Sequence, residues 1–164
     1  MVDVDTESSP DRERILVAVD FSEYSRRALA TAARLATSLG AELVVLHVIN
    51  DPAEAPGFYR LSKKKSLKKT RKRLKTLMES AEDIMEAFMK LAGEEDEALA
   101  ALSELRTVLV HGVPVFRILE MARQERVSFI VMGSHGRTGP EHLLLGSKAE
   151  RVVRLSPGTV VVVK

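Results

Sequence analysis

The feature that most constrains the fold of this sequence is a helix-like segment enclosed by two runs of β-branched residues. Residues 15–20 (ILVAVD) and 41–49 (AELVVLHVI) are nearly continuous apolar runs, which are typical of strands buried on both faces. Between them, apolar residues recur at helical spacing from Ala28 to Leu39. Ser22 suits the N-cap of this helix, and Gly40 suits the left-handed residue that ends it. The pattern predicts a βαβ unit with parallel strands.

The same alternation resumes in the second half of the chain. We predict strands at about residues 106–110, 128–132 and 159–164, with a helix that begins at Pro114 and a last helix over about 147–155. The class is therefore α/β, a doubly wound five-stranded parallel sheet with helices on both faces. Ligands of such sheets bind beyond the carboxyl ends of the strands, at the topological switch point. The residues around Asp20, Val48, Val110 and Met132 are the ones to inspect.

The composition limits the chemistry that is available. A chain of 164 residues suits one domain, expected over residues 14–164 after a disordered leader at 1–13. There is no cysteine, which excludes disulfides, thiolate nucleophiles and cysteine-based metal sites, and the four histidines form no His-x-x-x-His pair. No apolar run approaches the ~18 residues of a membrane span, and no signal peptide is visible. We expect a cytoplasmic protein without a membrane anchor.

A charged insertion at about 52–104 interrupts the alternation. Residues 60–75 hold ten basic residues and no acidic one, whereas residues 79–104 hold nine acidic residues and one lysine. An apolar stripe predicts one or two helices here, with a break at Gly93. The basic part has two interpretations: a solvated face that pairs with the acidic part in an antiparallel hairpin, or a nucleic-acid surface. Few aromatic residues lie nearby, so the second would rely on phosphate contacts.

The loop after the fourth predicted strand carries the most specific signal for a ligand. Gly133 and Gly136 follow the strand directly, and Gly146-Ser147 opens the last helix after nine intervening residues. Glycine lets a backbone approach a ligand closely, and a helix N-terminus offers unpaired N–H donors to phosphate. Ser147 and Glu150 also fit a capping box, which would give Ser147 a structural role. The spacing matches neither the Walker nor the Rossmann loop.

With these residues in place, the chain resembles the ATP-binding branch of the universal stress protein family. The resemblance covers residues 15–20, 46–49 and 131–164, and the loop spacing is that of the family's ATP-binding members. It implies a sheet of order 3-2-1-4-5, a homodimer, and ATP with magnesium bound between the first and fourth strands.

The resemblance also implies roles for individual residues. Asp20 would contact the ribose, and Val19 and Val48 would border the adenine. Backbone at the loop and the last helix would hold ribose and phosphates, through Gly133, Gly136, Gly146, Ser147 and Lys148. The expected binding set is completed by Met132, His135 and Arg137. For Asp20, a role as the cap of the following helix competes with the ribose contact, and for His135, exposure to solvent competes with a binding role. His47 and His111 are expected to be structural, hydrogen-bonded histidines.

The resulting hypothesis is an ATP-binding regulatory module that acts as a homodimer through the C-terminal strand. Four successive valines at the edge of the expected sheet invite pairing with another chain. One alternative is a slow ATP hydrolase, although phosphoryl transfer normally needs metal-bridging acids and Asp20 is the one carboxylate expected nearby. A second alternative is an interaction protein that binds an unknown partner through the insertion.

Overall fold

The computed structural model describes residues 12–50, 66–136 and 145–164. In chain order its elements are β1 (Arg14–Val19), α1 (Glu23–Leu39), β2 (Glu42–Ile49), α2 (Ser66–Glu95), α3 (Glu97–Ala100), β3 (Leu105–His111), α4 (Pro114–Gln124), β4 (Phe129–Gly133), α5 (Ser147–Leu155) and β5 (Thr159–Val163). The strands form one sheet of order β3-β2-β1-β4-β5, with every neighbouring pair parallel. The predicted fold class and the strand order implied by the resemblance are both confirmed.

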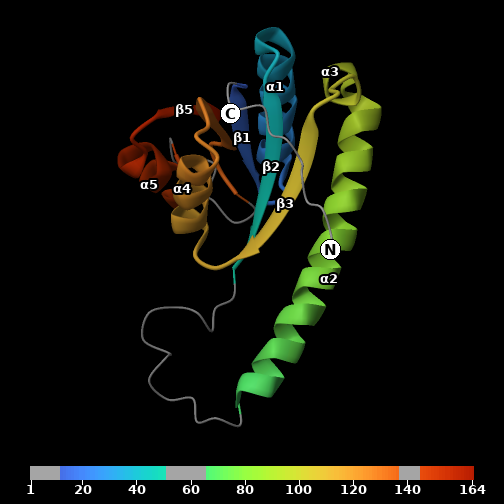
Figure 1. The fold of residues 1–164 in the computed structure, drawn as a ribbon, viewed down its shortest axis with the longest axis vertical. Coiled ribbons are helices and arrows are strands. Elements are labelled where there is room, and N and C mark those ends of the chain that lie inside the picture. Colours follow the sequence, from blue (N-terminus) through green and yellow to red (C-terminus); the bar gives the residue numbers. More distant parts are fainter. Residues whose placement is uncertain (1–11, 51–65, 137–144) are drawn as a thin grey trace, which may run out of the picture.

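Helices cover both faces of the sheet (Figure 1). α1, α2 and α3 pack over one face, against side chains such as Val17 and Val45. α4 and α5 pack over the other, against side chains such as Leu16 and Leu46. Because successive side chains of a strand point to opposite faces, β1 and β2 bury both sets. This explains why their sequences are continuous apolar runs rather than alternating ones.

The helix α1 begins and ends as its sequence predicts. The Oγ of Ser22 accepts a hydrogen bond from the backbone N–H of Ser25 at 3.2 Å, and Gly40 adopts the left-handed conformation with φ 61°. The buried face of α1 consists mostly of alanine, which lets the helix lie close to β1 and β4. The start of α1 is thereby fixed directly beside the end of β1.

A single helix, α2, occupies most of the charged insertion. It passes through Gly93 without interruption, so the predicted break at Gly93 is wrong. The break falls at Asp96, whose Oδ1 accepts hydrogen bonds from the N–H groups of Ala98 (2.9 Å) and Leu99 (3.1 Å) and so starts α3. The basic and acidic residues from 66 to 95 share one helix, so the expected hairpin is also wrong there. Residues 52–65 of the expected insertion lie outside the described residues.

The C-terminal half of α2 packs on the domain, whereas its N-terminal half does not reach the sheet. Ala81, Met85 and Ala92 are buried, and Phe88 contacts the ring of Phe21 edge-on. Figure 1 shows the other half continuing past the end of the sheet. Even so, among the described helices none is both long enough and apolar enough to cross a membrane.

An ion-pair network joins the amino-terminal ends of three strands. The carboxylate of Glu42 accepts from the Nε atoms of Arg14 (2.9 Å) and Arg106 (2.6 Å), and Arg106 also pairs with Glu125 at 2.6 Å. Burial alone would raise the pKa of Glu42, but the hydrogen bonds from Arg106 and Arg14 outweigh it and leave this pKa below its ordinary value. The network therefore favours the ionised carboxylate.

The expected leader at residues 1–13 is described only at its last two positions. Arg12 pairs with Glu104 at 3.0 Å, and the carbonyl of Glu13 accepts a hydrogen bond from the N–H of Glu42 at 2.9 Å. These two residues are thus attached to the domain.

Candidate functional site

A pocket of about 430 Å³ opens at the edge of the sheet where β1, β2 and β4 end. It lies on the α4 and α5 side, and the first residues of these two helices, Pro114 and Ser147, line it with strand residues such as Leu46. The strand order reverses between β1 and β4, so this is the switch point at which the sequence predicts a ligand. The volume falls within the range of sites for small molecules.

The structure brings nearly all the predicted site residues around this one pocket. Those that line it are Val19, Asp20, Val48, Met132, Gly133, His135, Gly136, Gly146, Ser147 and Lys148. Arg137 lies outside the described residues. Residues from three separate parts of the chain therefore meet as the switch-point rule predicts.

The side chain of Val19 packs away from the pocket, although the sequence predicts that it borders the ligand. It belongs to the apolar cluster beneath α1, on the opposite face of the sheet, and its carbonyl accepts a hydrogen bond from Nδ1–H of His47 at 2.8 Å. Its neighbour Ala18 packs with the cluster beneath α4 and α5. His47 is the hydrogen-bonded structural histidine that was predicted, while His111 lies exposed at the end of β3.

Asp20 follows β1 and is fixed by the start of α1. Its Oδ1 accepts hydrogen bonds from the N–H of Ser22 (3.2 Å) and from the Ser22 hydroxyl (2.5 Å), and Ser22 in turn caps the helix. The expected alternative of Asp20 as the cap itself is therefore wrong, because Asp20 supports the residue that caps. This support holds one carboxylate oxygen in place at the pocket.

Phe21 sits between Asp20 and Ser22 in a strained conformation. Its φ of 64° lies in the left-handed region, which a bulky residue adopts at an energetic cost. Its ring packs against His47, with centroids 4.2 Å apart, and against Phe88 of α2. These contacts hold the sharp turn that carries Asp20, and no sequence signal identified it.

The three described glycines of the loop, Gly133, Gly136 and Gly146, provide space rather than unusual backbone angles. None of them has a positive φ in the structure. A Cβ at Gly133 would lie 2.9 Å from the backbone carbon of Tyr24, so this glycine is required for packing against α1. A Cβ at Gly136 would lie 2.6 Å from Oδ2 of Asp20, and one at Gly146 would lie 3.2 Å from the carbonyl oxygen of Ser134. Gly136 is thus the glycine that faces the carboxylate of Asp20.

The N-terminus of α5 points its donors at the pocket without a side-chain cap. Gly146 is the N-cap, and its own N–H donates to the carbonyl of Ser134 at 2.8 Å, which closes the base of the loop. Ser147 is the first helical residue and Glu150 pairs with Arg154, so the predicted capping box is wrong. The first helical hydrogen bond of α5 runs from the N–H of Glu150 to the carbonyl of Gly146. The N–H groups of residues 147–149 therefore have no acceptor within the helix. They are therefore available to an anion.

His135 is buried, which contradicts the expectation that it is exposed. It is 8% exposed, its Nδ1 contacts the Oγ of Ser134 at 3.1 Å, and its ring lies 5.3 Å from that of Tyr24. Its Nε2 has no hydrogen-bond partner among the described residues. The ring fills the corner between α1 and the loop, so part of its role is to position the loop backbone.

Seven pocket residues were not assigned to the site from the sequence. They are Ala18, Ser25, Leu46, Pro114, Ile118, Ser134 and Ala149. The alternation of a strand could have identified Leu46, which lies two residues before Val48 on the same face. Pro114 also begins the helix after β3, one of the places that the switch-point rule names.

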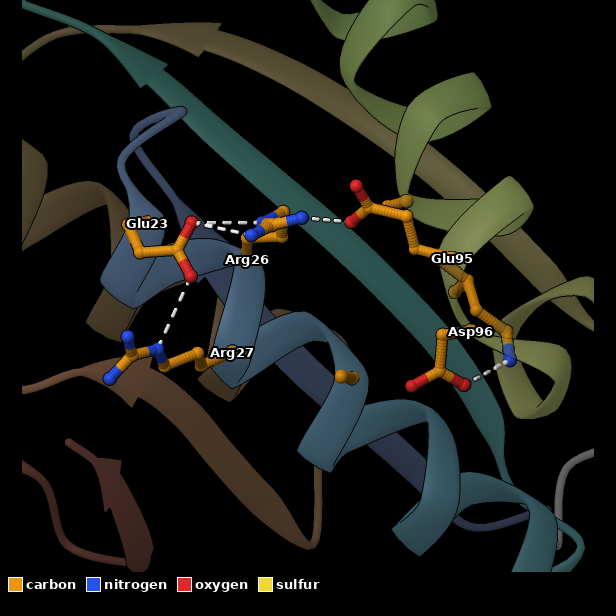
Figure 2. A pocket seen from close by; sticks show the side chains of 8 residues that line it. Glu23, Arg26, Arg27, Glu95 and Asp96 are labelled. Carbon is orange, nitrogen blue, oxygen red and sulfur yellow. Dashed lines mark hydrogen bonds and ion pairs between the residues drawn. The ribbon is translucent and has the colours of Figure 1, made fainter.

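A second, smaller pocket of about 150 Å³ lies between α1 and the end of α2 (Figure 2). Arg26 bridges Glu23 of its own helix and Glu95 of α2, and Arg27 also contacts Glu23. The hydrogen bond from Arg26 lowers the pKa of Glu23. The charges here pair with one another, so this cluster acts as a clasp between two helices rather than as a ligand site.

No cluster of three or more metal-ligating side chains occurs in the parts of the chain that the structure describes. Asp20 is the one carboxylate among the described residues that line the larger pocket. The pocket is lined by the first turn of α5, which includes the cationic residue Lys148, and backbone N–H groups of such a turn are suited to a phosphate.

Comparisons with known proteins identify related chains along almost the whole length. A model of the universal stress protein family matches residues 11–164. Universal stress protein MJ0577 of Methanocaldococcus jannaschii is 33% identical, over 93% of this chain and 94% of that protein, and its solved structure gives a TM-score of 0.72. UspA from Lactobacillus plantarum is 25% identical over 93% and 97% of the two chains, with a TM-score of 0.72.

A universal stress protein from Archaeoglobus fulgidus has been solved in complex with dAMP. It is 20% identical, covers 93% of this chain and 98% of that one, and gives a TM-score of 0.56. At this identity the likeness shows the fold alone.

Proposed function

This chain belongs to the universal stress protein family, and on that premise we propose that it is a regulatory module that binds ATP in the 430 Å³ pocket. The observation that carries the proposal is the convergence of three features on one cavity. These are the carboxylate of Asp20 at the switch point, the close approach of Gly136, and the uncapped N-terminus of α5. Together they offer a site for a ribose beside a site for phosphates.

Each part of a nucleotide has a matching part of the pocket. Apolar side chains of Val48, Met132 and Ile118 suit the base. Asp20, fixed through Ser22, suits the ribose hydroxyls. The first-turn N–H groups of α5, with Lys148, suit the phosphates, and the exposed Ser147 hydroxyl adds a donor. Magnesium would be held chiefly by the phosphate oxygens, since Asp20 is the one nearby carboxylate of the described residues.

Binding rather than turnover is the proposed activity. Phosphoryl transfer usually needs acidic metal ligands and a residue that positions the attacking water. Around this pocket the described chain offers Asp20, already hydrogen-bonded to Ser22, and His135, held in contact with Ser134. We therefore propose slow hydrolysis only as the alternative. The dAMP complex of the Archaeoglobus fulgidus protein supports nucleotide binding for this fold.

A single-turnover assay separates the two activities. The protein is mixed in excess with limiting ATP and magnesium, and ADP is followed alongside the fraction of ATP bound. A regulatory module holds most of the ATP intact over many binding lifetimes, whereas a hydrolase converts the bound ATP at a constant first-order rate. Asp20→Asn provides the control, because it removes the proposed ribose contact.

We further propose a homodimer through β5. This strand forms an edge of the sheet and pairs with β4 along Thr159–Val163, and no other described strand pairs with its outer edge. Such an edge is suited to pairing with β5 of a second copy. Two modules joined in this way would allow the nucleotide state of one to be sensed by the other.

A further inference from the structure

The turn between β1 and α1 is held from the face of the sheet opposite the pocket. Asp20 lines the pocket, whereas the ring of the next residue, Phe21, packs in the apolar cluster beneath α1 and α2. The φ of 64° at Phe21 carries an energetic cost, so this conformation persists only while the surrounding contacts hold it. The position of Asp20 therefore depends on the side chains that cover the ring of Phe21.

Residues of β2 and of α2 contact this ring. The ring of His47 in β2 lies 4.2 Å from that of Phe21, and Nδ1 of His47 also contacts the carbonyl of Val19 at 2.8 Å. Phe88 of α2 meets Phe21 edge-on, with ring centroids 5.4 Å apart. β2 is fixed between β1 and β3, whereas α2 packs over one edge of the sheet. The contact with Phe88 is therefore the one that a displacement of α2 would change.

The same face of α2 also reaches the first turn of α1. Glu95 lies seven residues after Phe88, two helical turns, so the two side chains point to one side of α2. The carboxylate of Glu95 pairs with Arg26, which also binds Glu23 in the first turn of α1 (Figure 2). Phe88 and Glu95, here called the α2 grip, thus contact the chain on both sides of Ser22.

Ser22, which lies between these two contacts, fixes the carboxylate of Asp20. Its N–H and its hydroxyl both donate to Oδ1 of Asp20. Rotation about φ of Phe21 changes the placement of Ser22 relative to Asp20. Relaxation of Phe21 to a negative φ would therefore move the carboxylate from its place opposite Gly136. A ribose contact by Asp20 requires the held form of the turn.

We propose that the α2 grip positions Asp20 for the nucleotide, and that bound ATP in turn stabilises the attachment of α2 to the domain. This inference rests on the proposed function, because it assigns Asp20 to the ribose. A ligand that binds only the held turn shifts the protein toward that form. Such coupling acts equally in both directions, so the attachment of the charged insertion depends on whether the pocket is occupied.

Calorimetry with ATP and magnesium compares variants of α2. Phe88→Ala should bind ATP about fivefold or more weakly than the wild type. Phe88→Tyr, which keeps an aromatic ring at this position, should restore most of the affinity. Met85→Ala, which removes a buried side chain from the same helix, should lower stability without changing the affinity. An equal loss of affinity in Phe88→Ala and Met85→Ala would overturn the proposal.

A double-mutant cycle tests whether Phe88 acts through Phe21. Phe21→Gly removes the ring and allows a positive φ without strain. In that background, Phe88→Ala should cause no further loss of ATP affinity, because the ring that it supports is gone. The same loss in both backgrounds would overturn the proposal.

Hydrogen exchange separates this inference from the proposed function. The Ser22 N–H donates to Asp20, so its exchange reports whether the turn is held. In the nucleotide-free protein this exchange should be faster in Phe88→Ala than in Met85→Ala. If the wild type binds no ATP, the proposed function fails, while faster exchange at Ser22 in Phe88→Ala would still support the positioning of Asp20 by α2. Unchanged exchange at Ser22 would overturn the inference whatever the result with ATP.

The reverse direction is measured on the wild type and needs no substitution. Saturating ATP with magnesium should slow the exchange of amides at residues 85–95 by about the factor that Phe88→Ala costs in affinity. ATP binding that leaves the exchange of these amides unchanged would overturn the proposal.

Discussion

A side chain at Gly136 would place its Cβ 2.6 Å from Oδ2 of Asp20. The two residues come from opposite ends of the chain's core, one after β1 and one after β4, and they meet at the switch point. The close approach means that the position of the carboxylate depends on the absence of a side chain across from it. The ribose site proposed for Asp20 is therefore coupled to the glycine of the phosphate loop.

Gly136→Ala and Gly133→Ala should have different consequences. A methyl group at Gly136 would meet the end of the Asp20 side chain, which can shift, so we expect little change in stability. Because the shift moves the proposed ribose contact, we expect ATP affinity to fall roughly tenfold, about 1.4 kcal/mol. At Gly133 the obstacle is the backbone of Tyr24, so we expect the free energy of unfolding to fall by about 1–3 kcal/mol. Urea unfolding and calorimetry measure the two effects. A stability loss at Gly136 equal to that at Gly133 would contradict this assignment.

Ser147→Ala should affect binding but not stability. The Ser147 hydroxyl makes no capping hydrogen bond in α5, so its removal should change the free energy of unfolding by less than about 0.5 kcal/mol. It should weaken ATP binding by roughly 1 kcal/mol, because the backbone donors remain. Ser22→Ala removes a real cap and should cost about 1 kcal/mol of stability. A destabilised Ser147→Ala protein would mean that the hydroxyl caps the helix after all.

Glu42→Gln should lower stability in a pH-dependent way. At pH 7 the loss of the charge facing Arg14 and Arg106 should cost about 1–2 kcal/mol. The pKa of Glu42 in the folded protein lies below its ordinary value of 4.5, so its contribution is complete above that pH and is lost as the pH falls through the lowered value. The difference between wild type and Glu42→Gln should therefore shrink in acid. Urea unfolding at pH 7 and pH 3 measures the difference in free energy of unfolding between the two proteins. A difference that is the same at both pH values would contradict this role of Glu42.

Val162→Lys should dissociate the proposed β5 dimer while keeping the fold. Val160, Val161 and Val163 pack against the two core clusters, so Val162 is the valine of β5 whose replacement disturbs the core least. A lysine on an edge strand opposes pairing with another chain. Sedimentation should show that the mass of this variant is half that of the wild-type species joined through β5. Its circular dichroism spectrum should be unchanged. A variant that associates as wild type does would remove β5 from the interface.

The sequence predicts the sheet well because its signals are local and repeated. The buried strands β1 and β2, the caps Ser22 and Gly40, and the crossover rule together determine a parallel sheet. The glycine spacing also points to the residues that line the pocket. The rest depends on contacts distant in sequence. The turn at Phe21 is held by Phe88, and the burial of His135 by Tyr24, and neither contact leaves a local pattern.

The errors in the charged insertion have a similar origin. Glycine inside a helix costs about 1 kcal/mol, which the packing of Ala92 and Met85 on the domain offsets, so α2 continues through Gly93. The helix α2 ends before Asp96 because the side chain of Asp96 accepts hydrogen bonds from the N–H groups of Ala98 and Leu99 and so starts α3. At Ser147 the capping pattern is present, but the loop enters α5 one residue earlier, so Gly146 takes the cap position.

Calorimetric titration of the 164-residue chain measures whether the pocket at the ends of β1 and β4 binds ATP, as proposed. ATP with magnesium should bind at a ratio of one per chain, and Gly146→Val, which crowds the carbonyl of Ser134 and the start of α5, should bind at least tenfold more weakly while remaining folded. Absence of binding by the wild type at millimolar ATP with magnesium, or equal binding by folded Gly146→Val, would contradict the account.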